Sequence, residues 1–193
     1  KSVFSDGITF NGTATYKAEF GGLPGYFSAN MIYSTKGSTD YSSLQITDEN
    51  ALFLERTDGV YFGAFKFQQY LSHDLANPDN GWGVFGQLGF GSNGNRLSTQ
   101  AMLGLAGSSP IEGRENDRWG VAWSRFFWAD ELSDASLINS GVNIKDEWVV
   151  EAFYEAEINE FFRAGANVFY VQPTLGNFDD LIQVGVRIRA TFD

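Results

Sequence analysis

The 193-residue sequence contains no cysteine, a single histidine and only 4 prolines. Without cysteine the chain cannot build a disulfide framework, a thiolate zinc site or a cysteine nucleophile, and this suits export through an oxidising periplasm. One histidine also excludes a metal site built from several histidines within this chain. No uninterrupted apolar run approaches the roughly 18 residues that a membrane-spanning helix requires. That last absence leaves a transmembrane barrel open, because its strands are only about half apolar.

Basic residues and helical patterns are also scarce. The chain carries 13 Lys and Arg against 24 Asp and Glu, for a formal net charge of −11. This excess of negative charge argues against nucleic acid as a partner. No apolar period of 3.6 residues extends over a useful length, so the sequence predicts no substantial helix.

The pattern that is present is a strict alternation, clearest in LIQVGVRIRATFD at residues 181–193. Ile182, Val184, Val186 and Ile188 are apolar, and polar residues or glycine stand between them. Such a two-residue period predicts a strand with one apolar and one polar face.

Eight further segments share this alternation, and together they predict nine antiparallel strands in one β domain over residues 1–193. The predicted strands are residues 8–20, 25–35, 59–71, 81–91, 96–107, 117–128, 147–157, 161–172 and 181–193. The two longest connections, residues 36–58 and 129–146, fall at the same end of an up-and-down sheet. Shorter turns dominate the other end, as is typical of outer-membrane barrels with periplasmic turns and extracellular loops. The shorter connections are residues 21–24, 72–80 and 107–116 and the turn at Asn159.

The apolar rows could face either a soluble β-sandwich core or lipid. Aromatic residues near the strand ends favour lipid, because they form girdles at membrane interfaces. These residues are Trp82, Trp119, Trp148, Tyr154, Tyr170 and Phe192. Small residues in mid-row, such as Ala152, Ala164 and Ala166, would fill a soluble core poorly. The predicted fold is therefore all-β, an antiparallel up-and-down transmembrane β-barrel, with the soluble sandwich as the alternative.

Four segments resemble, in order and spacing, the C-terminal half of carbohydrate-selective porins of the OprB type. They are GWGVFGQLGFG, SSPIEGRENDRWGVAWSR, EWVVEAFYEAEINEFFRAGANVFYVQPTLGN and LIQVGVRIRATF. The resemblance spans roughly residues 59–192, and its most specific pieces are Gly113-Arg114 and Gln172-Pro173. Ile111-Glu112-Gly113 stands where the family more often has a proline before the glycine.

This resemblance implies a sixteen-stranded barrel in the outer membrane of a Gram-negative bacterium, through which sugars diffuse. It implies neither an enzyme nor a cofactor. Family members are about twice as long, so we expect this chain to be the C-terminal portion of a larger barrel. The remaining strands would come from an N-terminal part or a second chain, and a homotrimer is left open. A self-contained eight-stranded barrel is the alternative.

The polar rows supply candidate pore-lining residues, namely Lys17, Glu19, Lys66, Glu151, Glu155, Arg163, Asn167, Arg187 and Arg189. Pairing around Asn159 predicts Glu155 opposite Arg163, and the next hairpin predicts Arg163 opposite Arg189. A carboxylate and two guanidiniums would then lie side by side and offer partners to sugar hydroxyls. The alternative is that these charges only keep the lumen wet.

Aromatic residues on the polar rows are candidates for stacking on saccharide rings, namely Tyr26, Phe62, Phe85 and Phe153. They could equally fill gaps between inward side chains. Arg125 shares the row of Trp119 and Trp123, so it would face lipid unless it reaches the rim or a bulge intervenes.

The predicted loops concentrate acidic residues without the D-x-D-x-D-G spacing of a calcium loop. Solvated loop charge is thus the favoured interpretation, and divalent bridges to lipopolysaccharide are the alternative. Ser72-His73-Asp74 suggests a catalytic triad, but residues adjacent in sequence rarely converge in space, so we expect no enzyme.

Overall fold

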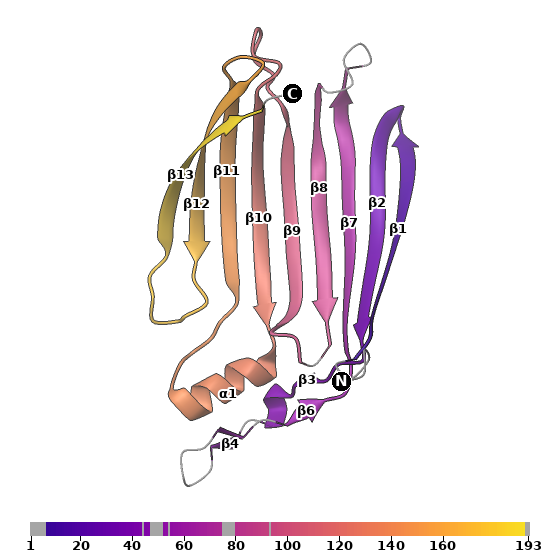
Figure 1. Ribbon diagram of the computed structural model, residues 1–193. Helices are drawn as coiled ribbons and strands as arrows, with labels where there is room; N and C mark the ends of the chain where they lie inside the picture. Colours follow the sequence, from indigo (N-terminus) through magenta and orange to yellow (C-terminus); the bar gives the residue numbers. More distant parts are fainter. Residues whose placement is uncertain are drawn as a thin grey trace.

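The computed structural model describes residues 7–43, 45–46, 52–53, 55–74, 80–92 and 94–191. Its main feature is a single antiparallel sheet of nine long strands, which lie side by side in Figure 1. They are β1 (Thr9–Phe20), β2 (Leu23–Ser34), β7 (Val60–His73), β8 (Gly81–Gly91), β9 (Leu97–Ser108), β10 (Arg118–Trp128), β11 (Glu147–Glu157), β12 (Phe162–Gln172) and β13 (Leu181–Ala190). The prediction of nine strands is confirmed, with boundaries within two residues except at the end of the last strand, where β13 stops at Ala190 and the prediction extends to residue 193.

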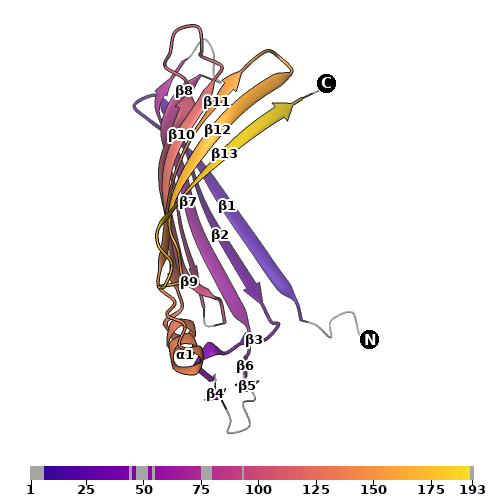
Figure 2. The same cartoon turned by 90° about the vertical axis from the view of Figure 1, so that its left-hand side faces the viewer.

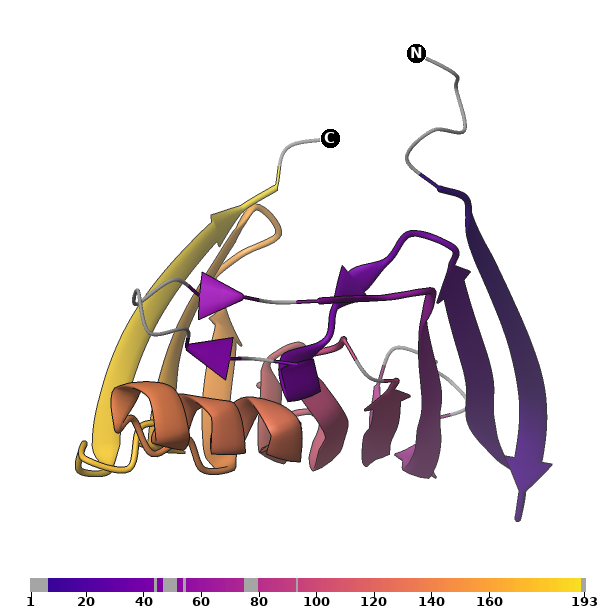
Figure 3. The ribbon, with the colours of Figure 1, turned by 90° about the horizontal axis from the view of Figure 1, so that it is seen from below.

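The long strands pair in chain order, from β1 at one edge to β13 at the other. Figure 2 shows this sheet from the side, as one twisted layer. A soluble sandwich requires two stacked sheets, so that alternative is wrong for the part of the chain that the structure describes. Figure 3 shows that the sheet curves into an arc. The arc is not closed, because β1 and β13 do not pair with each other.

The convex face of the arc is apolar and exposed. On β13 the side chains of Ile182 and Val186 are 71% and 80% exposed, and large apolar side chains are exposed along the other long strands as well. Within the described residues, only Ala64 and Ala129 are buried apolar residues. The sheet therefore has no packed core of its own, and its apolar rows need a different apolar environment.

Short elements gather at one end of the sheet, here called the loop end, which is the lower end in Figure 1. They are β3 (Ser38–Thr39), η1 (Tyr41–Ser43), β4 (Gln45–Ile46), β5 (Leu52–Phe53), β6 (Arg56–Thr57) and α1 (Asp130–Ser140). The opposite end, here called the turn end, carries the connections around Gly21, residues 109–117 and residues 158–161. Both long connections thus lie at one end, as the sequence predicts.

Helix α1 contradicts the expectation that the chain has no substantial helix. Asp130 and Glu131 in its first turn interact favourably with the helix dipole and stabilise the helix. Gly141 ends the helix with a φ of 67° and donates its N–H to the Leu137 carbonyl. The helix lies at the rim, where it does not need the apolar stripe of a core helix. No helix among the described residues has the length and apolar character needed to cross a membrane.

Candidate functional site: a charged groove on the concave face

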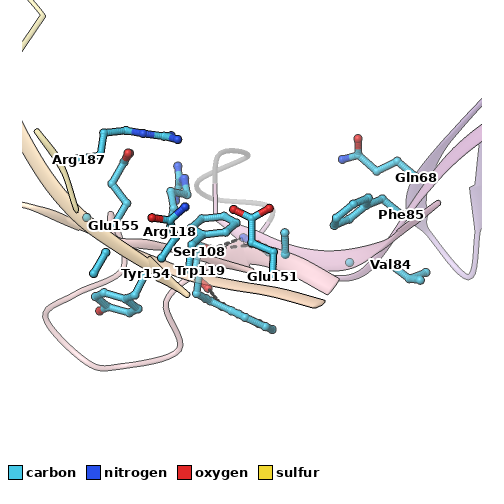
Figure 4. Close-up of a pocket in the computed structure, with 18 of the residues that line it drawn as sticks. Gln68, Val84, Phe85, Ser108, Arg118, Trp119, Glu151, Tyr154, Glu155 and Arg187 are labelled. Atoms are coloured by element: carbon cyan, nitrogen blue, oxygen red, sulfur yellow. Dashed lines mark hydrogen bonds between the residues drawn. The ribbon is translucent and has the colours of Figure 1, made fainter. Parts of the chain in front are cut away.

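The concave face carries a groove of about 520 Å³, lined by residues of β7 to β13. Figure 4 shows Gln68, Phe85, Arg118, Glu151, Glu155 and Arg187 on one side of the sheet, with Val84 and Tyr154 on the other. The groove thus lies on the polar side of the alternation. It is displaced toward the turn end, where β11 and β12 connect.

The strand register places every predicted pore-lining and stacking residue on this concave face. One row across the sheet pairs Lys17 with Tyr26, Tyr26 with Gln68 and Gln68 with Phe85. It continues through Gly104, Ala122 and Glu151 to Phe169 and Gln183. Since side chains alternate along each strand, the other predicted residues, each an even number of positions away on its strand, share the face. These are Glu19, Phe62, Lys66, Phe153, Glu155, Arg163, Asn167, Arg187 and Arg189.

The groove brings together about half of the predicted residues. Those that line it are Phe85, Glu151, Phe153, Glu155, Asn167, Arg187 and Arg189. The others lie elsewhere on the same face, namely Lys17, Glu19, Tyr26, Phe62, Lys66 and Arg163. Of these, the Lys17 ammonium lies 5.8 Å from the centre of the Tyr26 ring, close to the β1 edge.

The predicted charge cluster exists, but one pairing in it differs from the prediction. Arg163 stands opposite Arg189, as the sequence predicts, whereas it stands opposite Glu157 rather than Glu155. Glu155 is only 8% exposed. Its carboxylate lies 3.4 Å from the Arg189 guanidinium and 3.9 Å from that of Arg163. Arg163 also forms an ion pair with Glu157. The hairpin turn is one residue further along than predicted, which shifts the pairing by two residues and preserves the face.

A third arginine and a turn residue belong to the cluster although the sequence did not single them out. Arg118 on β10 stands directly opposite Glu155 and lines the groove. Asn116 donates its side-chain amide to Glu157 at 2.8 Å and accepts a 3.0 Å hydrogen bond from Arg163 on its backbone carbonyl. The turn between β9 and β10 therefore holds two charged side chains of the next hairpin in place. Arg118 lies an even number of residues from Gly120 and Ala122 on the same strand, and this spacing was the sequence signal that places it on the concave face.

Asp117, at the base of the same turn, is almost fully buried, with 1% of its surface exposed. It accepts hydrogen bonds from the Tyr154 hydroxyl at 2.5 Å, the Glu157 N–H at 2.8 Å and Arg114 Nε at 2.7 Å. Desolvation alone would raise the pKa of Asp117, but these donors outweigh it and the net pKa lies below the ordinary value. Asp117 thus anchors the turn to β11, and Arg114, which belongs to the Gly113-Arg114 motif, binds Asp117 from within the turn.

On the convex face, aromatic side chains form the two bands that the sequence predicts. Toward the turn end, Trp119 donates its indole N–H to the Ser108 carbonyl at 2.9 Å. Toward the loop end, Trp148 packs on Tyr170, with ring centres 5.2 Å apart. Phe192, the sixth predicted member, lies outside the described residues.

Arg125 lies on the convex face, and its guanidinium reaches the rim of the sheet. This is one of the two arrangements that the sequence analysis gives for keeping the charge out of lipid. Its guanidinium forms an ion pair with Asp146 at 3.0 Å and lies 4.6 Å from the centre of the Phe127 ring. The charge is thus neutralised near the end of β10. The register of β9 and β10 also shifts at Phe127 and Trp128, beyond Arg125.

The described residues contain no candidate metal site. Among them, no group of three or more His, Asp or Glu side chains could hold a metal ion. The ring of His73 packs edge-on against Tyr70, with centres 5.5 Å apart.

Comparison with known proteins agrees with this architecture. The family profile described as carbohydrate-selective porin, OprB family, matches residues 2–192. Among solved structures, the high-pH structure of OprB from Pseudomonas putida is similar, with a TM-score of 0.84 at 17% sequence identity. The similarity covers 97% of this chain and 49% of that chain, so this chain spans about half the length of its structural relative. No curated protein matches.

At 17% sequence identity the structural likeness shows only a shared fold. The family profile matches nearly the whole sequence and therefore shows the family. The resemblance seen in four sequence segments therefore extends to residues before 59 as well. The chain belongs to the OprB family of carbohydrate-selective porins.

Proposed function

We propose that this chain is part of a channel in the outer membrane of a Gram-negative bacterium, through which carbohydrates pass by passive, substrate-selective diffusion. It acts as a porin and not as an enzyme, and it needs no cofactor. Membership of the OprB family and the likeness to P. putida OprB support this proposal.

The observation that carries the proposal is the contrast between the two faces of one curved sheet. The convex face exposes apolar side chains along the strands and aromatic side chains near their ends. The concave face carries the charged residues and the groove. A lipid-facing exterior and a wet lumen require this combination.

The groove offers both polar and apolar contacts to a passing sugar. The side chains of Glu151 and Arg187 line it, and neither forms an ion pair or hydrogen bond with another described residue. Both can therefore bind hydroxyl groups of a solute. Phe85 and Phe153 line the same groove and supply ring faces for the apolar side of a saccharide.

Further strands complete the pore in this proposal. Because the sheet has nine antiparallel strands, β1 and β13 run in the same direction. Antiparallel closure then requires an odd number of added strands, and seven would give a sixteen-stranded barrel. An N-terminal part of the same protein or a second chain would supply them. Outer-membrane lipid would cover the convex face, lipopolysaccharide would meet the loop end, and a homotrimer is the proposed assembly.

Reconstitution of the complete porin in planar lipid bilayers tests this function. We expect ion conductance that added glucose or a short oligosaccharide partly blocks. Arg187→Ala should weaken the block, because the substitution removes an unpaired guanidinium from the groove. Glu112→Gln, in the exposed turn between β9 and β10, serves as the charge-changing control and should leave the block unchanged. Conductance that no sugar affects would instead indicate a general or structural outer-membrane barrel.

A further inference from the structure

Four small residues lie on the concave face of the two strands between Phe85 and Phe153, and one of them, Ala106, lines the groove. Gly104 and Ala106 lie on β9, and they stand opposite Ala122 and Gly120 on β10. Phe85 on β8 stands directly opposite Gly104, and Phe153 on β11 stands directly opposite Gly120. The two phenylalanines therefore border this patch of small residues from opposite sides.

Each phenylalanine ring occupies the space in which its glycine partner would carry a side chain. A β-carbon placed on Gly104 would lie 2.5 Å from Cζ of Phe85. A β-carbon placed on Gly120 would lie 2.5 Å from Cε1 and 3.0 Å from Cζ of Phe153. Such distances are far below van der Waals contact, so any larger residue would push the ring away from the sheet. Both rings thus lean toward each other across this patch of small residues.

The two glycines are diagonal neighbours across β9 and β10, about 7–8 Å apart. The rings above them therefore border one short stretch of wall, and Ala106 and Glu151 line the groove beside them. Arg187 and Arg189 lie on the same face, two strands beyond Phe153. This stretch presents two apolar rings beside charged groups, which matches the apolar ring faces and polar rim of a pyranose.

We propose that Gly104 and Gly120 are specificity-determining positions of the pore, because they hold Phe85 and Phe153 against the wall as a slot for a saccharide ring. This inference rests on the proposed carbohydrate transport and deepens it. The glycines are positioning residues, and the rings make the contact. A side chain at either position lifts a ring into the lumen, which narrows the passage and removes the slot.

Gly120→Ala is the cleaner test, because the nearest atoms to its added methyl group belong to the side chains of Phe153 and Ala106. At Gly104 the methyl group would also lie 2.8 Å from the backbone carbonyl of Val121. In the complete porin, Gly120→Ala should lower single-channel conductance and raise the half-blocking sugar concentration roughly fivefold. Unchanged values in a channel that sugar blocks would overturn the inference.

Gly63→Ala is a matched control on the lipid side. A β-carbon at Gly63 would lie 2.6 Å from two ring atoms of Phe90, and both residues face outward. This variant displaces a phenylalanine ring at a similar distance without touching the lumen. It should therefore leave conductance and sugar block as in the wild type. A change equal to that of Gly120→Ala would show that ring displacement anywhere in the sheet has this effect, and would overturn the inference.

The double variant Gly120→Ala/Phe153→Ala separates ring position from backbone strain. Removing the ring should restore assembly and conductance, while sugar block stays weak because half of the slot is missing. If Gly120→Ala does not assemble and the double variant does, the ring clash is confirmed. If neither assembles, the backbone itself needs glycine and the inference is wrong. A wild-type channel that no sugar blocks would instead refute the proposed function.

Discussion

At the scale of single residues, Asp117 shows how one buried carboxylate stabilises a turn. Asp117→Ala would leave three donors without their acceptor, namely the Tyr154 hydroxyl, the Glu157 N–H and Arg114 Nε. We expect a loss of about 1–3 kcal/mol in the free energy of unfolding. Guanidinium chloride titrations in lipid vesicles would measure it. Glu112→Ala in the same turn is exposed and should change stability little, so an equal loss there would contradict this prediction.

The lowered pKa of Asp117 adds a pH dependence to the same experiment. Because the folded-state pKa lies below the ordinary value of 3.8, the stabilisation is complete above that value and is lost as pH falls through the lowered pKa. Asp117→Asn removes the titrating group. The variant should therefore lose less stability than the wild type between about pH 7 and about pH 2.

The sequence predicts which face of the sheet a residue lies on better than it predicts which residue stands opposite it on the next strand. Alternation assigned Glu155, Arg163 and Arg189 to one face correctly, because the side-chain period of a strand is two whatever the register. The opposite partner of Glu155 depended on the position of the turn. There, Asn159 accepts hydrogen bonds from the N–H groups of Phe161 and Phe162, which fixes the register. Burial of Asp117 could not be predicted, because two of its three donors, the Tyr154 hydroxyl and the Glu157 N–H, lie on a strand 37 and 40 residues away.

At the scale of elements, the loop end is held by side chains that link separate connections. Thr174 accepts a hydrogen bond from the indole N–H of Trp128 at 3.1 Å and donates one to Glu147 at 3.0 Å. It thereby joins the end of β10 to the start of β11 on either side of α1. Thr174→Val keeps the shape and removes both bonds, so we expect faster proteolysis of residues 129–146 in the folded porin.

Thr99→Val is the matched control for that measurement. Thr99 lies on β9, pairs with Phe90, and faces outward. It carries the same substitution without a link between connections, so its cleavage rate should equal that of the wild type. Equal rates for Thr174→Val and the wild type would show that the loop end is held by other contacts.

Helix α1 was the element that the sequence analysis missed, and the reason is its location. Pattern analysis detects a helix through an apolar stripe, which a helix at an exposed rim does not need. The remaining signals were local ones, namely Asp130 and Glu131 at the start and Gly141 just past the end. The strands were detectable because each presents one apolar row along its whole length.

At the scale of the whole molecule, one sheet has an apolar face and a polar face, and the two-residue period of the sequence predicts both. The period does not predict how the sheet closes into a barrel, because the strand count and the curvature depend on strands beyond β1 and β13. The same limit applies to the groove, whose shape depends on cross-strand pairs such as Phe153 with Gly120. Fold class and facing were therefore predictable, whereas the site's dimensions were not.

The two environments can be told apart by placing one charge on either face at the same depth. Val184 and Gln183 are neighbours on β13, with Val184 on the convex face and 66% exposed. Val184→Arg would place a guanidinium in hydrocarbon and should destabilise the complete porin in lipid vesicles by about 2–4 kcal/mol. Gln183→Arg places the same group in the wet lumen and should cost well under half as much. Equal losses for the two variants would mean that lipid does not cover the convex face, and a soluble assembly would then have to cover Val184.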